Sequence, residues 1–216
     1  MSKLGRTQIV FLLSPLALMV LLLITAWILA PILDVWVWVP LCIVYWTTMG
    51  LISFLGMRKD GIRKMLEPSK RGLLWPMVAV LIPLVLLPLQ FLPNLRLLSP
   101  VWILLLTIIV ALINPWFEEI YWRGLLLEMS ANKPAWIGIL YSSVLFSSGH
   151  LILGIKSIAC RYPGLYISLF LLGVIWCVIY KKTNSLRWPL FSHFLIDIFT
   201  LSVPVFLNLY IPPGMK

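Results

Sequence analysis

Long apolar runs, each close to the length needed to cross a bilayer, dominate this sequence. A membrane-spanning helix needs about 20 mainly apolar residues. Runs of this kind occupy Gln8–Ile32, Val35–Met57, Leu73–Phe91, Val101–Leu127, Ala135–Ile155, Pro163–Tyr180 and Trp188–Tyr210. We therefore predict an all-α, polytopic helical membrane protein with about seven transmembrane helices.

Composition excludes an ordinary soluble protein. Of the 216 residues, 62% are hydrophobic and only 11% are charged, whereas soluble domains carry roughly 25% charged residues. No internal repeat is visible, so we expect one transmembrane domain over residues 1–216. The first apolar run is too long for a cleaved signal peptide and is expected to remain as a transmembrane helix.

The net charge of +10 indicates membrane orientation rather than nucleic-acid binding, because the basic residues gather in short loops between apolar runs. With the N-terminus in the cytoplasm, the opposite side holds only Arg96, Lys156, Arg161 and Lys216. The positive-inside rule favours this orientation. We expect a multi-pass plasma-membrane protein, prokaryotic by its compact size, with lipids as partners and the basic segment 58–71 at the cytoplasmic surface.

The cysteines give no metal or disulfide pattern. Cys42, Cys160 and Cys177 are odd in number and form no C-x-x-C pair. A disulfide framework is therefore not expected.

Three ionisable residues interrupt the fourth apolar run. Glu118, Glu119 and Arg123 follow Asn114 and Pro115, which are expected either to kink the helix or to start a new one with Asn114 as its cap. Charges at membrane depth are costly and usually pair or face a cavity. Glu119 and Arg123 are four residues apart and can pair, which leaves Glu118 freer. The alternative is that this ion pair only braces the helix.

Both histidines also lie in apolar runs. His150 shares a helical face with Ser143, Phe146 and Ser147, and His193 shares one with Asp197 at i, i+4. A lone histidine could simply bond a neighbouring helix. Counted by helix rise from the cytoplasmic ends of their helices, Glu118, His193 and His150 lie at depths of about 15, 8 and 22 Å. A common site would need helix tilt or frayed helix ends to bring these depths together. Nearly every ionisable residue at membrane depth nevertheless falls in these segments, which favours one shared pocket.

The ordered set E-E-x-x-x-R (Glu118–Arg123), F-x-x-x-H (Phe146–His150) and H-x-x-x-D (His193–Asp197) closely resembles the signature of the CAAX protease and bacteriocin-processing family, which includes the type II CAAX prenyl proteases. The resemblance covers Asn114 to about Thr200. It implies intramembrane peptide hydrolysis, in a cytoplasm-facing cavity, of a peptide or lipid-modified protein substrate.

The resemblance also implies roles for the site residues. Glu118 would be the general base, holding and deprotonating a water with His150. His193 and Asp197 would stabilise the oxyanion, and Glu119 with Arg123 would support the site. Many members carry Asn in place of Asp197, and an ionised Asp would repel an oxyanion. Asp197 would therefore either be protonated or orient His193.

Other mechanisms and functions stay open on sequence alone. The motifs G-x-S-x-G, S-x-x-K and H-E-x-x-H are absent, which argues against the usual serine and zinc proteases. We expect no cofactor, with zinc as an alternative because histidines and carboxylates can ligate it. Two non-enzymatic alternatives are a membrane protein that binds a bacteriocin-like peptide for self-immunity and a proton-coupled transporter.

Overall fold

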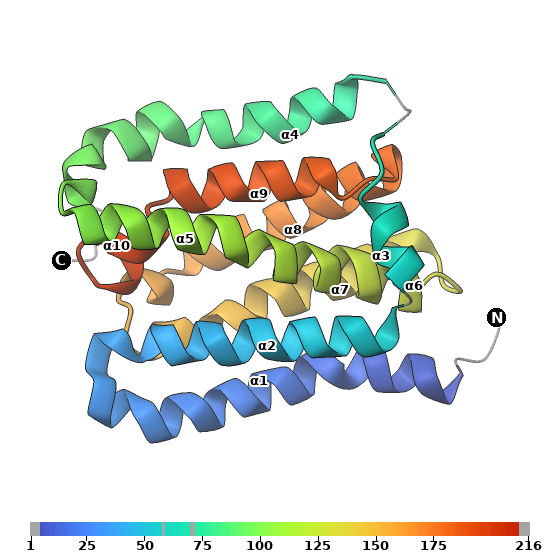
Figure 1. The fold of residues 1–216 in the computed structure, drawn as a ribbon, viewed down its shortest axis with the longest axis horizontal. Coiled ribbons are helices and arrows are strands. Elements are labelled where there is room, and N and C mark those ends of the chain that lie inside the picture. The colour runs from blue at the N-terminus through green and yellow to red at the C-terminus, as the bar shows by residue number, and fades with distance from the viewer. Residues whose placement is uncertain (1–4, 58, 70–71, 212–216) are drawn as a thin grey trace.

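The computed structural model describes residues 5–57, 59–69 and 72–211, and these form an α-helical bundle (Figure 1). The α-helices are α1 (Arg6–Leu33), α2 (Trp38–Gly56), α3 (Lys59–Met65), α4 (Leu74–Leu84), α5 (Val101–Glu118), α6 (Leu126–Met129), α7 (Ala135–Gly149), α8 (Pro163–Thr183), α9 (Arg187–Phe199) and α10 (Ser202–Phe206). Segments of 3₁₀-helix occupy η1 (Asp34–Val37), η3 (Leu92–Leu98), η5 (His150–Ile155) and η6 (Ala159–Arg161). Segments of π-helix occupy η2 (Leu87–Phe91) and η4 (Glu119–Leu125).

The long helices lie roughly along one axis, and α1 begins at the opposite end of the bundle from α10 (Figure 1). We call the end with α3, α6 and the α8–α9 connection the basic end. There, the Leu186 N–H donates to the Met65 carbonyl at 2.8 Å and ties α3 to the connection. The far end carries η1, η6 and α10, where Lys156 pairs with Asp34 at 2.8 Å. Helix α9 packs against α4, α5 and α8 and lies between α4 and α5 in Figure 1.

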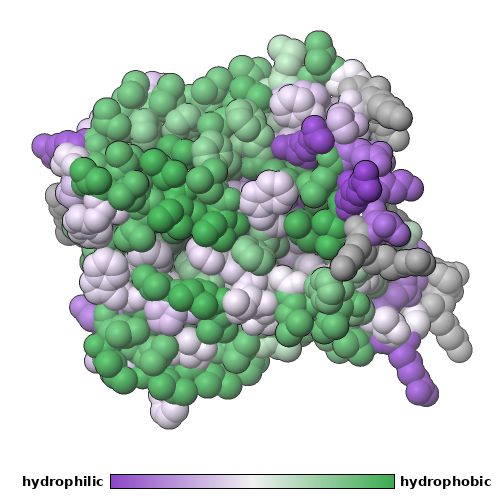
Figure 2. Space-filling view, in the orientation of Figure 1, coloured by the Kyte–Doolittle hydropathy of each residue, from purple (hydrophilic) through white to green (hydrophobic). Residues whose placement is uncertain are grey.

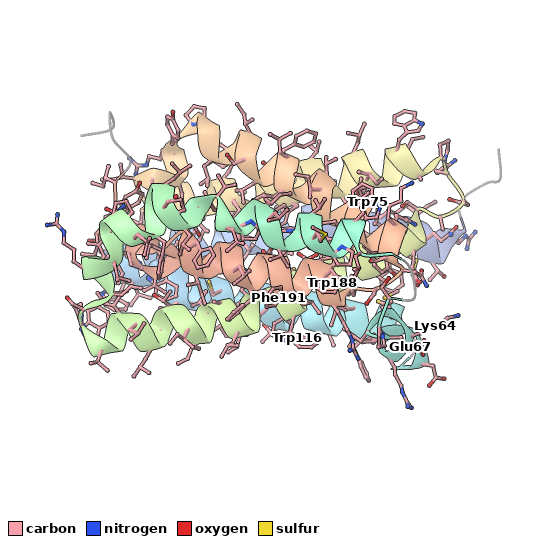
Figure 3. All side chains as sticks on the ribbon, turned by 90° about the horizontal axis from the view of Figure 1, so that it is seen from above. Lys64, Glu67, Trp75, Trp116, Trp188 and Phe191 are labelled. Carbon is pink, nitrogen blue, oxygen red and sulfur yellow. The ribbon has the colours of Figure 1, made fainter. Side chains whose placement is uncertain are left out.

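The surface of the bundle is suited to lipid. Figure 2 shows apolar residues over most of the visible face, with hydrophilic residues gathered towards the basic end. Exposed tryptophans occur near both ends, Trp36 and Trp102 at the far end and Trp136 at the basic end. Figure 3 places Trp75 and Trp188 in the half of the bundle that carries Lys64 and Glu67. Tryptophans at this level are typical of membrane–water interfaces, and the chain is an integral membrane protein.

Five segments among the described residues are long and apolar enough to span a membrane: Arg6–Gly56, Leu74–Leu98, Val101–Met129, Ala135–Ile155 and Pro163–Thr183. The first joins the two predicted spans now seen as α1 and α2. The prediction of an all-α polytopic membrane protein is confirmed.

The last predicted span, Trp188–Tyr210, is not one helix. α9 ends at Phe199, and Leu201 adopts a left-handed conformation with φ 56° before α10 begins. Such a conformation is strained for a bulky residue. Hydrogen bonds hold the break: Gln90 Nε2 donates to the Thr200 carbonyl at 2.9 Å, and Ser202 Oγ donates to the Asp197 carbonyl at 3.0 Å. Hydropathy does not detect a backbone reversal of this kind.

Close helix contact at Gly173 offers a test of the packing. A Cβ there would lie 3.1 Å from Ser143 Cβ and 3.2 Å from its Cα, because α8 meets α7 closely at this point. Gly173→Leu should therefore destabilise the protein by about 1–3 kcal/mol through overpacking. The loss is measured by heating the detergent-solubilised protein and following tryptophan fluorescence.

Gly61→Leu in α3 is the matched control, because nothing lies within 4 Å of a Cβ at that position. Equal thermal stability of the two variants would contradict the close α7–α8 contact.

Candidate functional site

Glu118 and Glu119 stand at a change in helical winding. α5 continues through Asn114 and Pro115 to Glu118, and η4 then follows in π-helical form. Asn114 therefore does not cap a new helix, which corrects one of the two sequence expectations. Pro115 has no N–H to donate back to the preceding turn, and π-helical turns often accompany functional sites. All of η4 is buried except Ile120.

The imidazole of His193 lies between the two adjacent carboxylates. Its Nδ1 is 2.8 Å from Glu119 Oε1, and its Nε2 is 3.2 Å from Glu118 Oε2. Adjacent helical residues point in different directions, but the two nitrogens of one ring also point apart, so a single ring can reach both. The ring stacks on Trp176 with centroids 4.3 Å apart, which fixes its plane.

Arg123 holds Glu119 from the other side. Arg123 Nη1 donates to Glu119 Oε1 at 3.0 Å, and both side chains are fully buried. The guanidinium lies over the rings of Phe146 and Trp176, at 4.4 and 5.0 Å from their centroids. The predicted pairing of Glu119 with Arg123 is therefore present. Arg123 thereby fixes the position of the Glu119 carboxylate, which in turn accepts a hydrogen bond from His193.

Asp197 and Asn114 complete the cluster. Asn114 Nδ2 donates to Glu118 Oε2 at 3.2 Å and to Asp197 Oδ2 at 3.1 Å, so one amide links the two acids. Asp197 Oδ1 lies 3.5 Å from His193 Nε2. Trp46 Nε1 donates to Asn114 Oδ1 at 2.8 Å, which fixes the direction of the amide.

Tyr45 on α2 is a site residue that sequence reasoning missed. Its hydroxyl donates to Glu118 Oε1 at 2.7 Å and accepts from Trp122 Nε1 at 3.1 Å. Glu118 thus accepts hydrogen bonds from three helices. A tyrosine in an apolar run gives no signal of its own, although Asn114 could have been noticed as a polar residue one turn before Glu118.

His150 lies apart from this cluster. Its Nδ1 is 2.9 Å from the Phe146 carbonyl. That oxygen can only accept, so Nδ1 carries the hydrogen and Nε2 is an acceptor in the neutral ring. Among the described residues, His150 makes no hydrogen bond to Glu118. The Phe146 ring stands between the two histidines, 4.9 Å from the His150 ring and 6.3 Å from the His193 ring.

A cavity of about 770 Å³ joins these groups, with Glu118, His150, His193 and Asp197 all in its wall. The wall also includes Leu41 and Tyr45 of α2, Gln90, Thr200, Cys160 of η6, Tyr162 and Phe206 of α10. Most of its other lining side chains are apolar. This is a size and character typical of ligand pockets.

The cavity runs from the acidic cluster to the far end of the bundle. None of its lining residues belongs to α3, η4, α6 or the α8–α9 connection. The family resemblance implied a cavity that faces the cytoplasm, and this stays a prediction. At the basic end the buried side chains of Trp122, Arg123 and Leu125–Leu127 fill the space instead.

No group of three or more His, Cys, Asp or Glu side chains within the described part of the chain has an arrangement that could hold a metal ion. The three cysteines are free. His193 is occupied on both nitrogens by carboxylates.

Comparison with known protein families finds a match for part of the chain. Residues 100–199, just under half of the chain, match the family model described as type II CAAX prenyl endopeptidase Rce1-like. This match supports placing the chain with the CAAX proteases. No curated protein and no solved structure matches it.

The match supports a CAAX-type intramembrane endopeptidase, a peptide hydrolase that acts on a peptide or prenylated protein. The matched segment includes all three signature pieces, from Glu118 to Asp197. Tyr45 and Trp46 of α2 lie outside it, so two contacts to the acidic cluster come from beyond the matched region.

The buried ion pair of Glu119 and Arg123 gives a second test. Arg123→Met removes one charge and leaves Glu119 buried beside His193, which should destabilise the protein by about 3–5 kcal/mol. In the double variant Arg123→Met/Glu119→Gln the uncompensated carboxylate is gone, and the loss should be smaller than the sum of the single losses. Thermal unfolding in detergent measures all three. Strict additivity would show that the two side chains do not stabilise each other.

Proposed function

We propose that Glu118 is the general base of a glutamate-type endopeptidase and that it activates a water held between its carboxylate and His150. The supporting observation is that Glu118 and His150 face one cavity while His193 and Asp197 flank Glu118 in the same wall. Tyr45, Asn114 and His193 occupy part of the acceptor capacity of the carboxylate. A carboxylate offers about four lone-pair sites, which leaves room for one water.

The proposed reaction begins at the water. Its oxygen attacks the carbonyl carbon of the scissile amide, and its proton moves to Glu118. The C–N bond then breaks, and Glu118 returns the proton to the departing amine. His150 Nε2, an acceptor in the tautomer set by the Phe146 carbonyl, orients the water from the other side of the cavity.

His193 is the proposed donor to the tetrahedral oxygen. Its Nε2 hydrogen faces Glu118 before the reaction. When Glu118 takes up the proton from water its charge disappears, and the hydrogen becomes available to the developing oxyanion. Asp197 and Glu119 keep the ring in place from two directions. In this proposal Asp197 is a positioning residue, and its own donor, Asn114, limits its effect on the oxyanion.

Removal of the base tests the central step. Glu118→Gln should lower cleavage of a farnesylated peptide with a CAAX-type C-terminus by about 10²–10⁴-fold, because the amide cannot accept the proton. Cleavage is followed by mass spectrometry with the purified protein in lipid nanodiscs. Glu128→Gln, an exposed carboxylate on the same helical segment, is the control and should be fully active. Full activity of Glu118→Gln would end the proposal.

Tyr45 tests the positioning of that base. Tyr45→Phe removes a hydrogen bond to a charged group, worth about 1.5–3 kcal/mol, and should lower kcat about tenfold to a hundredfold. KM should stay constant, because Tyr45 contacts the carboxylate rather than the peptide. Tyr141→Phe is the control: its hydroxyl bonds the Leu12 carbonyl, away from the acidic cluster. A change confined to KM, or none, would show that Tyr45 does not position Glu118.

A further inference from the structure

Asn114 presents its amide nitrogen to the carboxylates of the acidic cluster. Its Nδ2 donates to Glu118 Oε2 at 3.2 Å and to Asp197 Oδ2 at 3.1 Å. Its Oδ1 accepts from Trp46 Nε1 at 2.8 Å. An indole N–H can only donate and an ionised carboxylate can only accept, so these three bonds fix which way the amide points. The side chain also lies in the wall of the cavity.

Two hydrogen-bond donors converge on one oxygen of Glu118. His193 Nε2 lies 3.2 Å from Oε2, the same atom that accepts from Asn114 Nδ2. Tyr45 bonds the other oxygen, Oε1, and a carboxylate oxygen has two lone pairs, so Oε1 can also hold the attacking water. A negatively charged oxygen therefore lies within reach of an imidazole and an amide, both in the cavity wall. An oxyanion hole consists of preorganised donors of this kind, aimed at the oxygen that becomes charged.

We infer that Asn114 is a catalytic residue that supplies, beside His193, a second donor to the tetrahedral oxygen of the substrate. The inference rests on the proposed function, in which Glu118 takes the proton of the attacking water. Protonation removes the charge of the carboxylate, and hydrogen bonds to a neutral acceptor are weaker than those to an ionised one. In the same step the π electrons of the scissile C=O bond move to its oxygen, which becomes negatively charged. The Nδ2 hydrogen that faced Glu118 then bonds this oxyanion, while the other Nδ2 hydrogen stays on Asp197.

The amide is held in position before any substrate binds. Asp197, when ionised, has no hydrogen to donate, but its bond to one Nδ2 hydrogen keeps the other directed at Glu118. Trp46 holds the Oδ1 side, and its ring is stacked on Phe117 with centroids 6.3 Å apart and 13° between the planes. Donors that are fixed in advance cost no reorganisation during the reaction. Asp197 and Trp46 are thus positioning residues for Asn114.

Asn114→Leu tests the donor, because it removes the amide and keeps a side chain of similar size. Loss of one oxyanion donor should lower kcat by about 10²–10³-fold. KM should stay within about twofold, since the bond to the oxyanion exists only in the transition state. Both constants are measured with the farnesylated CAAX-type peptide and the purified protein in lipid nanodiscs.

Asn94→Leu is the matched control. Asn94 is also half-buried and donates its amide hydrogen, to the Gln90 carbonyl at 2.8 Å, but it is not part of the cavity wall. This variant should keep the kcat of the unchanged protein. A kcat of Asn114→Leu equal to that of Asn94→Leu would overturn the inference.

A phosphinate analogue of the same peptide separates a direct role of Asn114 from a role through Glu118. Its tetrahedral phosphorus replaces the scissile amide, and its charged oxygen imitates the oxyanion. Isothermal titration calorimetry measures its affinity. Asn114→Leu should weaken binding at least about tenfold, both alone and in the Glu118→Gln background, because transition-state analogues report contacts made in the transition state. Unchanged affinity in both backgrounds would overturn the inference. A loss seen only where Glu118 is intact would also overturn it, since Asn114 would then act through the base.

Trp46→Phe tests the same amide where Asn114→Leu does not fold. Without the indole N–H the amide is free to turn its oxygen towards the acids, and kcat should fall about threefold to tenfold at constant KM. An unchanged kcat would count against Asn114 as a donor.

Glu118→Gln decides the proposed function separately. Full activity of that variant would refute Glu118 as the base, while weaker phosphinate binding by Asn114→Leu would still identify the donor. An inactive Glu118→Gln together with a fully active Asn114→Leu would refute this inference alone.

Discussion

The contact of one imidazole with two neighbouring carboxylates is the interaction on which the rest of the structure depends. His193 faces Glu119 through Nδ1 and Glu118 through Nε2, and Arg123 supports Glu119 from behind. Each of these charges alone would be costly at membrane depth. Together they neutralise much of one another's charge, and the helices that carry them must therefore pack at fixed depth and rotation. α9 is consequently held against α5 in the interior although it is too short to cross a bilayer.

The change of winding after Glu118 serves the same cluster. In η4 the side chains of Glu119 and Arg123 remain on one side and can pair, while α5 ends with Glu118 facing the cavity. Two consecutive acids thereby acquire different surroundings. Glu119 is enclosed by Arg123 and His193, whereas Glu118 has a cavity beside it. Different environments for adjacent carboxylates allow one to support the structure while the other remains open to chemistry.

Much of this could be predicted from sequence, because apolar run length and isolated charges are local signals. The lengths of the apolar runs predict the helical membrane fold. The i, i+4 spacing predicts the Glu119–Arg123 pairing, and the energetic cost of isolated charges in a membrane predicts that His193 and Asp197 gather near Glu118. The contributions of Tyr45 and Trp46 could not be predicted, since they depend on which face α2 presents to α5. The break at Leu201 also escaped prediction, because it depends on packing between distant segments, such as the hydrogen bond from Gln90 to the Thr200 carbonyl.

Charge balance explains why Asp197 is compatible with a hydrolytic site. Among the described residues, Glu118, Glu119 and Asp197 face two cationic groups, Arg123 and a His193 ring that has a carboxylate acceptor at each nitrogen and is therefore protonated. The fully ionised cluster of these three acids then has one negative charge in excess. Neutral donors surround that excess: Tyr45 bonds Glu118, and Asn114 bonds both Glu118 and Asp197. Hydrogen bonds from neutral groups stabilise an ionised carboxylate without cancelling its charge. Glu118, as the proposed general base, has to be ionised in order to accept a proton from water, and the hydrogen bonds from the amide and the phenol favour that ionised form.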